Sequence, residues 1–187
     1  LAFDYPPRAP FFRKELREFL LLAREEQVEP LNMTGSYAGA MGLPQFMPSS
    51  FRAYAVDFDG DGHINIWNNP VDAIGSVASY FKRHHWQPGQ PVVSAATVKG
   101  VQAEEGLTVG LDPVKTVGEL RALGWTSADP LADDLPVTAF RLEGADGAEH
   151  WLGLPNFFVI TRYNRSVMYA MAVNQLAELL VDARGKN

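Results

Sequence analysis

The segment Asp57–Trp67 constrains the chain more than any other. Its carboxylates alternate at Asp57, Asp59 and Asp61, and Gly62 then permits a sharp turn. Alternate side chains of a tight loop can point inward together, and a hard cation such as Ca²⁺ takes about six to eight oxygen ligands. Asp and Gly also favour solvated turns, but three aspartates so close repel one another without a cation. The pattern therefore favours a metal site over an acidic turn.

The same segment matches the first half of an EF-hand loop, D-x-D-x-D-G, and then departs from it. The twelfth position is Asn68 where a bidentate Glu is expected, so Asp72 is the predicted closing carboxylate of a longer loop. His63 lies where a backbone carbonyl normally binds, and we expect its C=O to serve. Because so many protein oxygens converge, the sequence predicts Ca²⁺ rather than Mg²⁺ at this EF-hand-like loop, 57–72.

Length and composition limit the class of protein. A chain of 187 residues predicts one compact domain, or one with a small subdomain. The net charge of -6 and the absence of a basic stripe argue against nucleic acid as a partner. No apolar run reaches about 18 residues, so we expect no transmembrane segment. Because the first residue is Leu1 rather than Met, we expect a processed product or a fragment.

Apolar periodicity predicts four main helices, over 11–27, 48–56, 71–84 and 166–183. A serine cap is expected at the start of the second. On the first helix, Glu15, Glu18, Glu25 and Glu26 are most simply a solvated face. Between Gln87 and Pro155 the sequence changes to short predicted strands, at 91–94, 137–142 and 150–154, with a short helix at 116–124. This pattern indicates a small α+β subdomain with antiparallel strands.

A glycine-rich stretch, 32–48, precedes the second helix and lacks the Lys-Ser/Thr pair of a phosphate loop. Its polar side chains Ser36 and Gln45 lie among apolar residues. One interpretation is a tight buried loop whose polar groups are satisfied internally. The other is a cleft wall that offers Ser36 and Gln45 to a ligand. The candidate apolar walls of such a cleft are Met41, Leu43, Phe46 and Met47.

Several of these motifs, in this order, resemble the lytic murein transglycosylase B family. The resemblance runs from Phe3 to about Gln175 and is carried by Gly35–Gly42, Gln45–Ser50, Asp57–Trp67, Pro70–Ala78, Gly153–Phe157 and Ile160–Asn164. It implies a bacterial enzyme in the periplasm or on the periplasmic face of the outer membrane. Such an enzyme cleaves the β-1,4 bond between N-acetylmuramic acid and N-acetylglucosamine of peptidoglycan glycan strands and leaves a 1,6-anhydromuramoyl product.

The family's general acid/base is a Glu in a Gly-Val-Glu-Thr-like stretch, which does not occur in these residues. The resemblance therefore implies that the catalytic Glu lies in an N-terminal segment upstream of Leu1, as a separate chain or a missing part. We expect no catalytic residue among the 187. By resemblance, the substrate-binding residues are Ser36, Gln45, Tyr80, Tyr163, Asn164, Tyr169 and Arg8. The calcium ligands are Asp57, Asp59, Asp61 and Asp72, with His63 through its backbone.

The combined prediction is an α+β fold with a mainly helical, lysozyme-like core. We expect residues 1–86 to form this core with its EF-hand-like loop, 87–155 the subdomain, and 156–187 the return to the core with a C-terminal helix. The predicted activity is that of a lytic transglycosylase. The alternative is a calcium-stabilised module that binds peptidoglycan without cleaving it.

Overall fold

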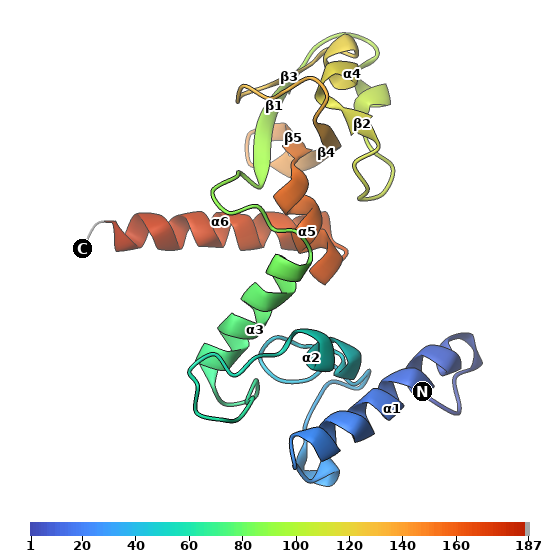
Figure 1. Cartoon of the computed structure of the whole chain (residues 1–187). Helices are drawn as coiled ribbons and strands as arrows, with labels where there is room; N and C mark the ends of the chain where they lie inside the picture. Colours follow the sequence, from blue (N-terminus) through green and yellow to red (C-terminus); the bar gives the residue numbers. More distant parts are fainter. Residues whose placement is uncertain (186–187) are drawn as a thin grey trace. The chain divides into compact units, whose positions relative to one another are not determined.

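The computed structural model describes residues 1–185 and divides into two compact units, Leu1–His84 and the residues from His85 onward. The first unit is helical: η1 (Pro6–Arg8), α1 (Ala9–Glu25), η2 (Pro30–Asn32), α2 (Pro48–Tyr54) and α3 (Pro70–Arg83). The second contains β1 (Val93–Val98), η3 (Ala103–Gly106), β2 (Lys115–Thr116), α4 (Val117–Ala122), β3 (Trp125–Ser127), β4 (Pro136–Gly144), β5 (Gly147–Gly153), α5 (Pro155–Tyr163) and α6 (Val167–Arg184). Figure 1 labels these elements along the chain.

In the first unit, α1 packs against α2, and the loop between them forms two small bridges, Gly35 with Met41 and Met41 with Phe46. Leu22 of α1, Phe51 of α2 and Ile66 of the acidic loop are buried. Burial of such side chains is the main driving force for holding these short elements together. Met41 and Phe46 of the glycine-rich stretch are buried as well, so the stretch contributes to this core.

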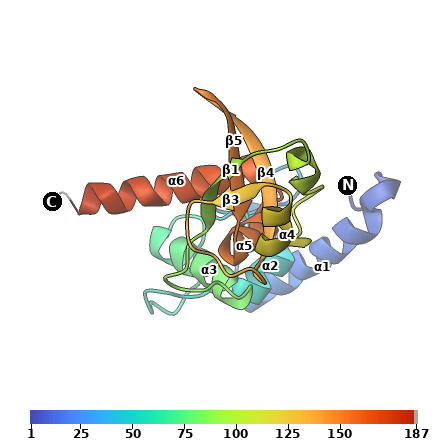
Figure 2. The same cartoon turned by 90° about the horizontal axis from the view of Figure 1, so that it is seen from above.

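The second unit is built on a five-stranded antiparallel sheet in the order β2-β4-β5-β1-β3. The β4–β5 hairpin closes where Gly144 pairs with Gly147, and Figure 2 shows this hairpin projecting from the sheet. One face packs on α4, with a core of Val117, Leu120, Trp125, Val137, Ala139, Leu152 and Leu154. The predicted strands 137–142 and 150–154 are confirmed, whereas the strand predicted at 91–94 begins later, at Val93.

After the sheet, α5 and α6 complete the second unit. Phe157 of α5 stacks on Phe140 of β4 with ring centroids 5.0 Å apart. Asn156 is buried, accepts a hydrogen bond from the Gln87 backbone N–H and donates to the carbonyls of Gln87 and Gln90. A helical fold with an antiparallel sheet confirms the predicted α+β class. The predicted division at 86 and 155 stays a prediction.

Candidate functional site

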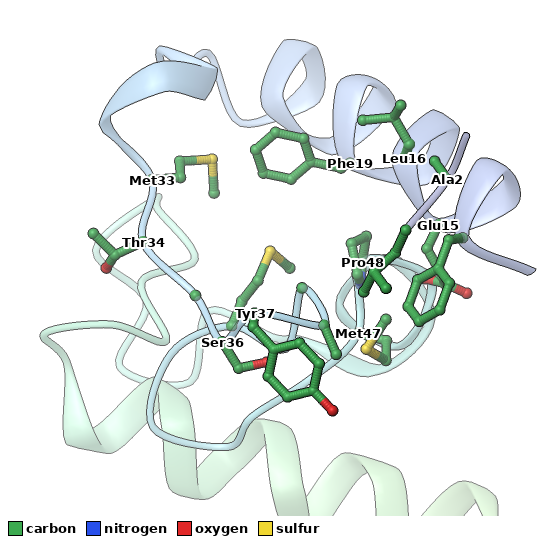
Figure 3. Close-up of a pocket in the computed structure, with 16 residues that line it drawn as sticks. Ala2, Glu15, Leu16, Phe19, Met33, Thr34, Ser36, Tyr37, Met47 and Pro48 are labelled. Atoms are coloured by element: carbon green, nitrogen blue, oxygen red, sulfur yellow. The ribbon is translucent and has the colours of Figure 1, made fainter. Parts of the chain in front are cut away.

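A cavity of about 310 Å³ lies between α1 and the glycine-rich loop of the first unit. Figure 3 shows Phe19 and Leu16 on α1, with Met33 beside Phe19 and with Ser36 and Tyr37 on the loop across from the helix. Its lining is mostly apolar, and its remaining members are Leu1, Ala2, Phe12, Glu15, Thr34, Gly35, Ala38, Gly39, Met41, Met47 and Pro48. A concave, mostly apolar site with few polar groups is typical of ligand-binding pockets.

The structure brings Ser36 to this cavity but not Gln45. Ser36 is exposed, and its Oγ accepts a hydrogen bond from the Ala40 backbone N–H at 3.1 Å. Gln45 does not line the cavity, and its Nε2 donates to the Gly42 carbonyl at 2.9 Å. The interpretation of a buried loop is therefore wrong for these two exposed side chains, although each has a local hydrogen bond.

The predicted apolar walls divide in the same way. Met41 and Met47 line the cavity. Leu43 is exposed and lies outside the lining. Phe46 is buried in an aromatic group with Tyr54 and Tyr80, at centroid distances of 6.4 and 6.1 Å. Only two of the four expected walls therefore face the space beside Ser36.

Glu15 is a correction to the sequence analysis. It is 5% exposed rather than solvated, and it lines the cavity. One carboxylate oxygen accepts from the Ser49 backbone N–H at 2.9 Å and the other from Ser49 Oγ at 2.8 Å. The serine cap is wrong as well, because the N-cap of α2 is Met47 and has no side-chain cap. A carboxylate from α1 satisfies one free N–H at the start of α2 instead.

Two further α1 carboxylates, Glu18 and Glu25, pair with Arg52 of α2 instead of facing solvent alone. The hydrogen bond from Arg52 lowers the pKa of Glu25, and the bonds to Glu25 and Glu18 raise the pKa of Arg52. Glu26 is half-buried, and desolvation raises its pKa. The expected solvated face therefore contains the contacts that hold α2, and the glycine-rich loop before it, against α1.

The acidic loop gathers Asp57, Asp59 and Asp61, each with a carboxylate oxygen within 4.8 Å of the others. Asp57 accepts backbone hydrogen bonds from Gly62 at 2.8 Å and Gly60 at 2.7 Å. These bonds, that from Gly62 first, lower the pKa of Asp57. Three hard oxygen donors from alternate residues fit a cation such as Ca²⁺.

Asp72, the predicted closing ligand, is fully buried beside this loop. Its Oδ1 accepts from the Phe58 N–H and its Oδ2 from the Asn65 N–H, both at 2.8 Å. Asn69 donates to Asp59 at 2.9 Å and caps α3. The Asp72 side chain thus fixes the two ends of the loop, and its part as a metal ligand stays a prediction. The His63 backbone N–H donates to Asp61 at 2.9 Å, and the side chain is exposed.

The other predicted binding residues fall in different surroundings. Tyr80 of α3 is buried, with ring centroids 4.8 Å from Tyr54 and 4.2 Å from His84. Arg8 lies over the rings of Phe11 and Phe12, 4.8 and 5.0 Å from their centroids.

The remaining three belong to the second unit. Tyr163 and Tyr169 stack with their planes 8° apart, and Asn164 is the C-cap of α5. Their role at a substrate site stays a prediction.

Comparison with known proteins shows which family the chain belongs to. Residues 1–178 match the family described as the transglycosylase SLT domain. The chain belongs to this family. The predicted resemblance is confirmed.

Named relatives agree with this assignment. The SLT domain is 52% identical to membrane-bound lytic murein transglycosylase B of Escherichia coli K12, over 98% of this chain and 50% of that protein. Its fold matches soluble lytic transglycosylase SltB1 of Pseudomonas aeruginosa with a TM-score of 0.95 and 70% identity, covering 99% of this chain and 61% of that one. It also matches E. coli lytic transglycosylase Slt35 in complex with calcium, with a TM-score of 0.87 and 49% identity over 98% of this chain and 57% of that one.

The SLT domain therefore spans about half the length of the E. coli relative. The lysozyme-like class predicted for the core agrees with these neighbours. Within residues 1–185, no helix combines the length and the apolar character needed to cross a membrane.

Proposed function

We propose that the chain is part of a peptidoglycan lytic transglycosylase that cleaves the β-1,4 bond between N-acetylmuramic acid and N-acetylglucosamine. The observation that carries the proposal is the apolar cavity with Ser36 at its wall, in a chain that belongs to the SLT family over residues 1–178. The names of the relatives, lytic murein transglycosylase B and SltB1, support it.

The cavity has the surroundings that a general acid requires but holds no free acid. A carboxyl group that protonates a glycosidic oxygen must retain its proton near neutral pH, and apolar walls favour the neutral form. Glu15 is the one carboxylate among the described residues that line the cavity, and Ser49 already engages both of its oxygens. We therefore assign Glu15 to the support of α2 rather than to proton transfer.

The acid is then a Glu upstream of Leu1. Leu1 and Ala2 line the cavity, so residues that precede them would start at its edge. The chain covers only 50% of the E. coli relative, which leaves ample length for such a segment. This segment is the first partner of the chain, and the glycan strand is the second.

In the proposed reaction the Glu donates its proton to the glycosidic oxygen as the bond between that oxygen and C1 breaks. The N-acetyl carbonyl oxygen of the substrate stabilises the positive charge at C1. The muramoyl 6-hydroxyl then forms a bond to C1 and returns its proton to the carboxylate, which closes the 1,6-anhydro ring without water. No second carboxylate is required, in contrast to the usual retaining glycosidase.

The proposed substrate contacts are those predicted by resemblance: Ser36, Gln45, Tyr80, Tyr163, Asn164, Tyr169 and Arg8. Amides and hydroxyls suit the N-acetyl and hydroxyl groups of sugars, and aromatic rings suit their apolar faces. Ser36 has the strongest support, because it lines the cavity. An Arg such as Arg8 would meet peptide or lactyl carboxylates.

We further propose that Ca²⁺ binds the acidic loop through Asp57, Asp59 and Asp61, with the His63 carbonyl and Asp72 completing the site. Two observations support this ligand set: the three carboxylates have oxygens within 4.8 Å of one another, and Slt35 has a solved structure in complex with calcium. When bound, the cation supplies structural stabilisation, since it neutralises the aspartates. The proposed location is the periplasm or the periplasmic face of the outer membrane, as the membrane-bound relative suggests.

The test compares this chain with the longer natural protein that includes the upstream region, each incubated with purified peptidoglycan. We expect anhydromuropeptides, detected by mass spectrometry, from the longer protein and none from residues 1–187 alone. Ser36→Ala in the longer protein should reduce the rate, whereas Asp146→Ala at the β4–β5 turn should not. Binding without any product from either form would instead favour a non-catalytic peptidoglycan-binding module. Product from the isolated chain would place the acid among these 187 residues and overturn the assignment.

A further inference from the structure

A second cavity lies in the first unit, between the C-terminal end of α1, η2 and residues 63–68 of the acidic loop. Its volume is about 580 Å³, and it adjoins the cavity at Ser36, since Met33 and Thr34 line both. In Figure 3 the side chain of Met33 points toward Phe19 of α1, whereas that of Thr34 points the opposite way. The segment 33–34 therefore separates two cavities with different surroundings.

The second cavity has a more polar lining than the first. Two carboxylates and three amides contribute to it: Glu26, Glu29, Asn32, Asn65 and Asn68. Neither Lys nor Arg is among the described residues that line it, so it lacks the permanent cation that usually binds a phosphate or a carboxylate. Within residues 1–185 the one cluster of three potential metal ligands is that of the acidic loop. The lining therefore suits an organic ligand that donates hydrogen bonds and carries no negative charge.

Trp67 forms the aromatic part of this lining, and two contacts hold its indole in place. Its Nε1 donates to the Thr34 carbonyl at 3.1 Å, and its ring lies against that of Phe51, with centroids 5.8 Å apart. The side chain is half-buried and lines the cavity, so part of the indole is open to a ligand. A sugar ring can pack its apolar face on such an indole without the entropic cost of ordering a mobile side chain.

The amides of the second cavity are available to a ligand. Asn65 Oδ1 accepts from the backbone N–H groups of Trp67 and Asn68, at 3.2 and 3.0 Å, which leaves the Asn65 NH₂ group to donate. Asn32 and Asn68 are exposed, and their side chains have no hydrogen-bond partner within residues 1–185. Amide N–H and C=O groups match the acetamido group of an N-acetylated sugar, and carboxylates accept hydrogen bonds from its hydroxyls.

We propose that the second cavity binds an N-acetylhexosamine unit of a glycan chain. The sugar ring packs on Trp67, the acetamido group meets Asn32 and Asn68, and the hydroxyls donate to Glu26. The volume lies within the range of about 300–1,000 Å³ that is typical of small-molecule sites. The inference rests on the proposed function for its choice of a glycan, but it requires no cleavage at either cavity.

An organic ammonium ion is a poorer occupant of the second cavity. It would use the two carboxylates but leave the three amides without a role. Glu29 is exposed to solvent, and its carboxylate already accepts from the Leu31 N–H. Solvent screening weakens the attraction of an exposed carboxylate for a cation. The mixture of amides, carboxylates and one aromatic ring therefore favours a neutral sugar.

The experiment titrates the longer natural protein with the β-1,4-linked tetramer of N-acetylglucosamine, at constant saturating Ca²⁺. This probe contains no N-acetylmuramic acid, so it lacks the bond that the proposed reaction cleaves. The protein carries 5-fluorotryptophan, and the ¹⁹F signal of Trp67 is the one that is absent from Trp67→Phe. We expect this signal to shift saturably with the tetramer. Combining Asn32→Ala with Asn68→Ala should raise the Kd about tenfold or more, because two hydrogen-bonding side chains are lost.

Two controls separate the second cavity from the rest of the protein. Gln102→Ala removes an exposed amide of the second unit and should leave the Kd unchanged. Ser36→Ala should leave the Kd read at Trp67 within about twofold of the parent value. Loss of the Trp67 shift in Ser36→Ala would mean that binding at the first cavity reaches Trp67 through Thr34, and would overturn the proposal. The absence of a saturable shift in the parent protein would overturn it as well.

Two further probes test the class of ligand. The glucose tetramer lacks acetamido groups and should bind about tenfold more weakly, so equal binding would overturn the assignment of an N-acetylated sugar. Tighter binding of the glucosamine tetramer, which carries amines instead, would identify a cation site and overturn the proposal. None of these measurements reads cleavage. A protein that shows the Trp67 shift but forms no anhydromuropeptides would therefore refute only the proposed reaction, and the reverse result would refute only the second cavity.

Discussion

At the scale of single residues, Glu15 is the least expected feature of the first unit. A carboxylate that is 5% exposed is costly to bury unless hydrogen bonds replace its water. Ser49 supplies both, one from its backbone and one from its hydroxyl. The same contact satisfies an N–H at the start of α2, where the N-cap side chain cannot. Glu15 thus stabilises the helix that follows the cavity wall.

Glu15→Ala should destabilise the protein by about 1–3 kcal/mol, because it leaves the half-buried Ser49 N–H without an acceptor. Glu15→Gln keeps one acceptor oxygen and nearly the same shape, so its loss should be about half as large. Lys14→Ala is the control, as an exposed neighbour on the same helix. Denaturant unfolding gives the three values. A Glu15→Ala loss no larger than that of Lys14→Ala would contradict the assigned role.

The position of Glu15 along α1 indicates burial, although its charge favours exposure to solvent. Phe12, Glu15 and Leu22 share the buried face of α1, spaced i, i+3, i+10, so periodicity alone places Glu15 inward. Its charge led to the prediction of a solvated side chain. Hydrogen bonds from Ser49, 34 residues away, allow it to be buried instead. The cluster of Asp57, Asp59 and Asp61 was predictable because its spacing is local. The position of Gln45 outside the cavity was not, because it depends on how the loop folds back on Gly42.

At the scale of elements, Arg52 joins α1 and α2 through Glu18 and Glu25. The hydrogen bond from Arg52 lowers the pKa of Glu25 in the folded chain. A lowered carboxyl pKa contributes stability that is complete above the unfolded value, about 4.3 for Glu, and is lost as the pH falls through the lower folded value. Arg52→Gln should therefore lower Tm by about 1–4 °C at pH 7, since the pair is solvent-screened.

The Tm difference between Arg52→Gln and the parent should shrink below about pH 4, where protonation of Glu25 removes the pair from the parent protein. High salt at pH 7 should also reduce it. Arg165→Gln, an exposed change in the second unit, is the control. A gap that stays constant from pH 7 to pH 3 would mean that Arg52 acts through packing rather than charge.

Element positions followed from the sequence wherever the signal was local. Pro70 opens α3, and Ser166 caps α6. A capping box of Thr116 and Glu119 opens α4. The cap of α2 was mispredicted because its acceptor comes from another helix. Likewise, β1 begins two residues later than its apolar run, since the register with β5 starts at Val93.

At the scale of the whole molecule, the sequence indicated a helical segment followed by a sheet, and the structure has both. The sequence did not predict the hydrogen bonds that Asp72 accepts from distant residues. That side chain is 14 residues from Phe58 and 7 from Asn65, yet it accepts a hydrogen bond from each. Hydrogen bonds therefore connect the loop to the buried part of α3. Any cation bound by this loop should stabilise the first unit as a whole.

The last prediction follows from that coupling. A ligand that binds only the folded state at about 100 times its Kd stabilises by about 2.7 kcal/mol, so saturating Ca²⁺ should raise Tm by about 5–10 °C over the value in EGTA. Asp59→Asn should reduce this rise by more than half. In EGTA the variant should be at least as stable as the parent, because the substitution removes repulsion between Asp59 and its two neighbours.

Differential scanning calorimetry with Ca²⁺ and with EGTA measures both effects, and Asp146→Asn at the exposed β4–β5 turn is the matched control. The decisive measurement is the sign of the Tm difference between Asp59→Asn and the parent protein in EGTA. In a metal-free acidic turn the substitution would affect only the hydrogen bonds that Asp59 accepts, from the Asn69 side chain and the Asp61 N–H. Asp59→Asn would then lower Tm equally with and without Ca²⁺. If the loop is a metal site, Asp59→Asn should lower the Tm only when Ca²⁺ is present, because the Asp59 carboxylate binds a cation only in that condition.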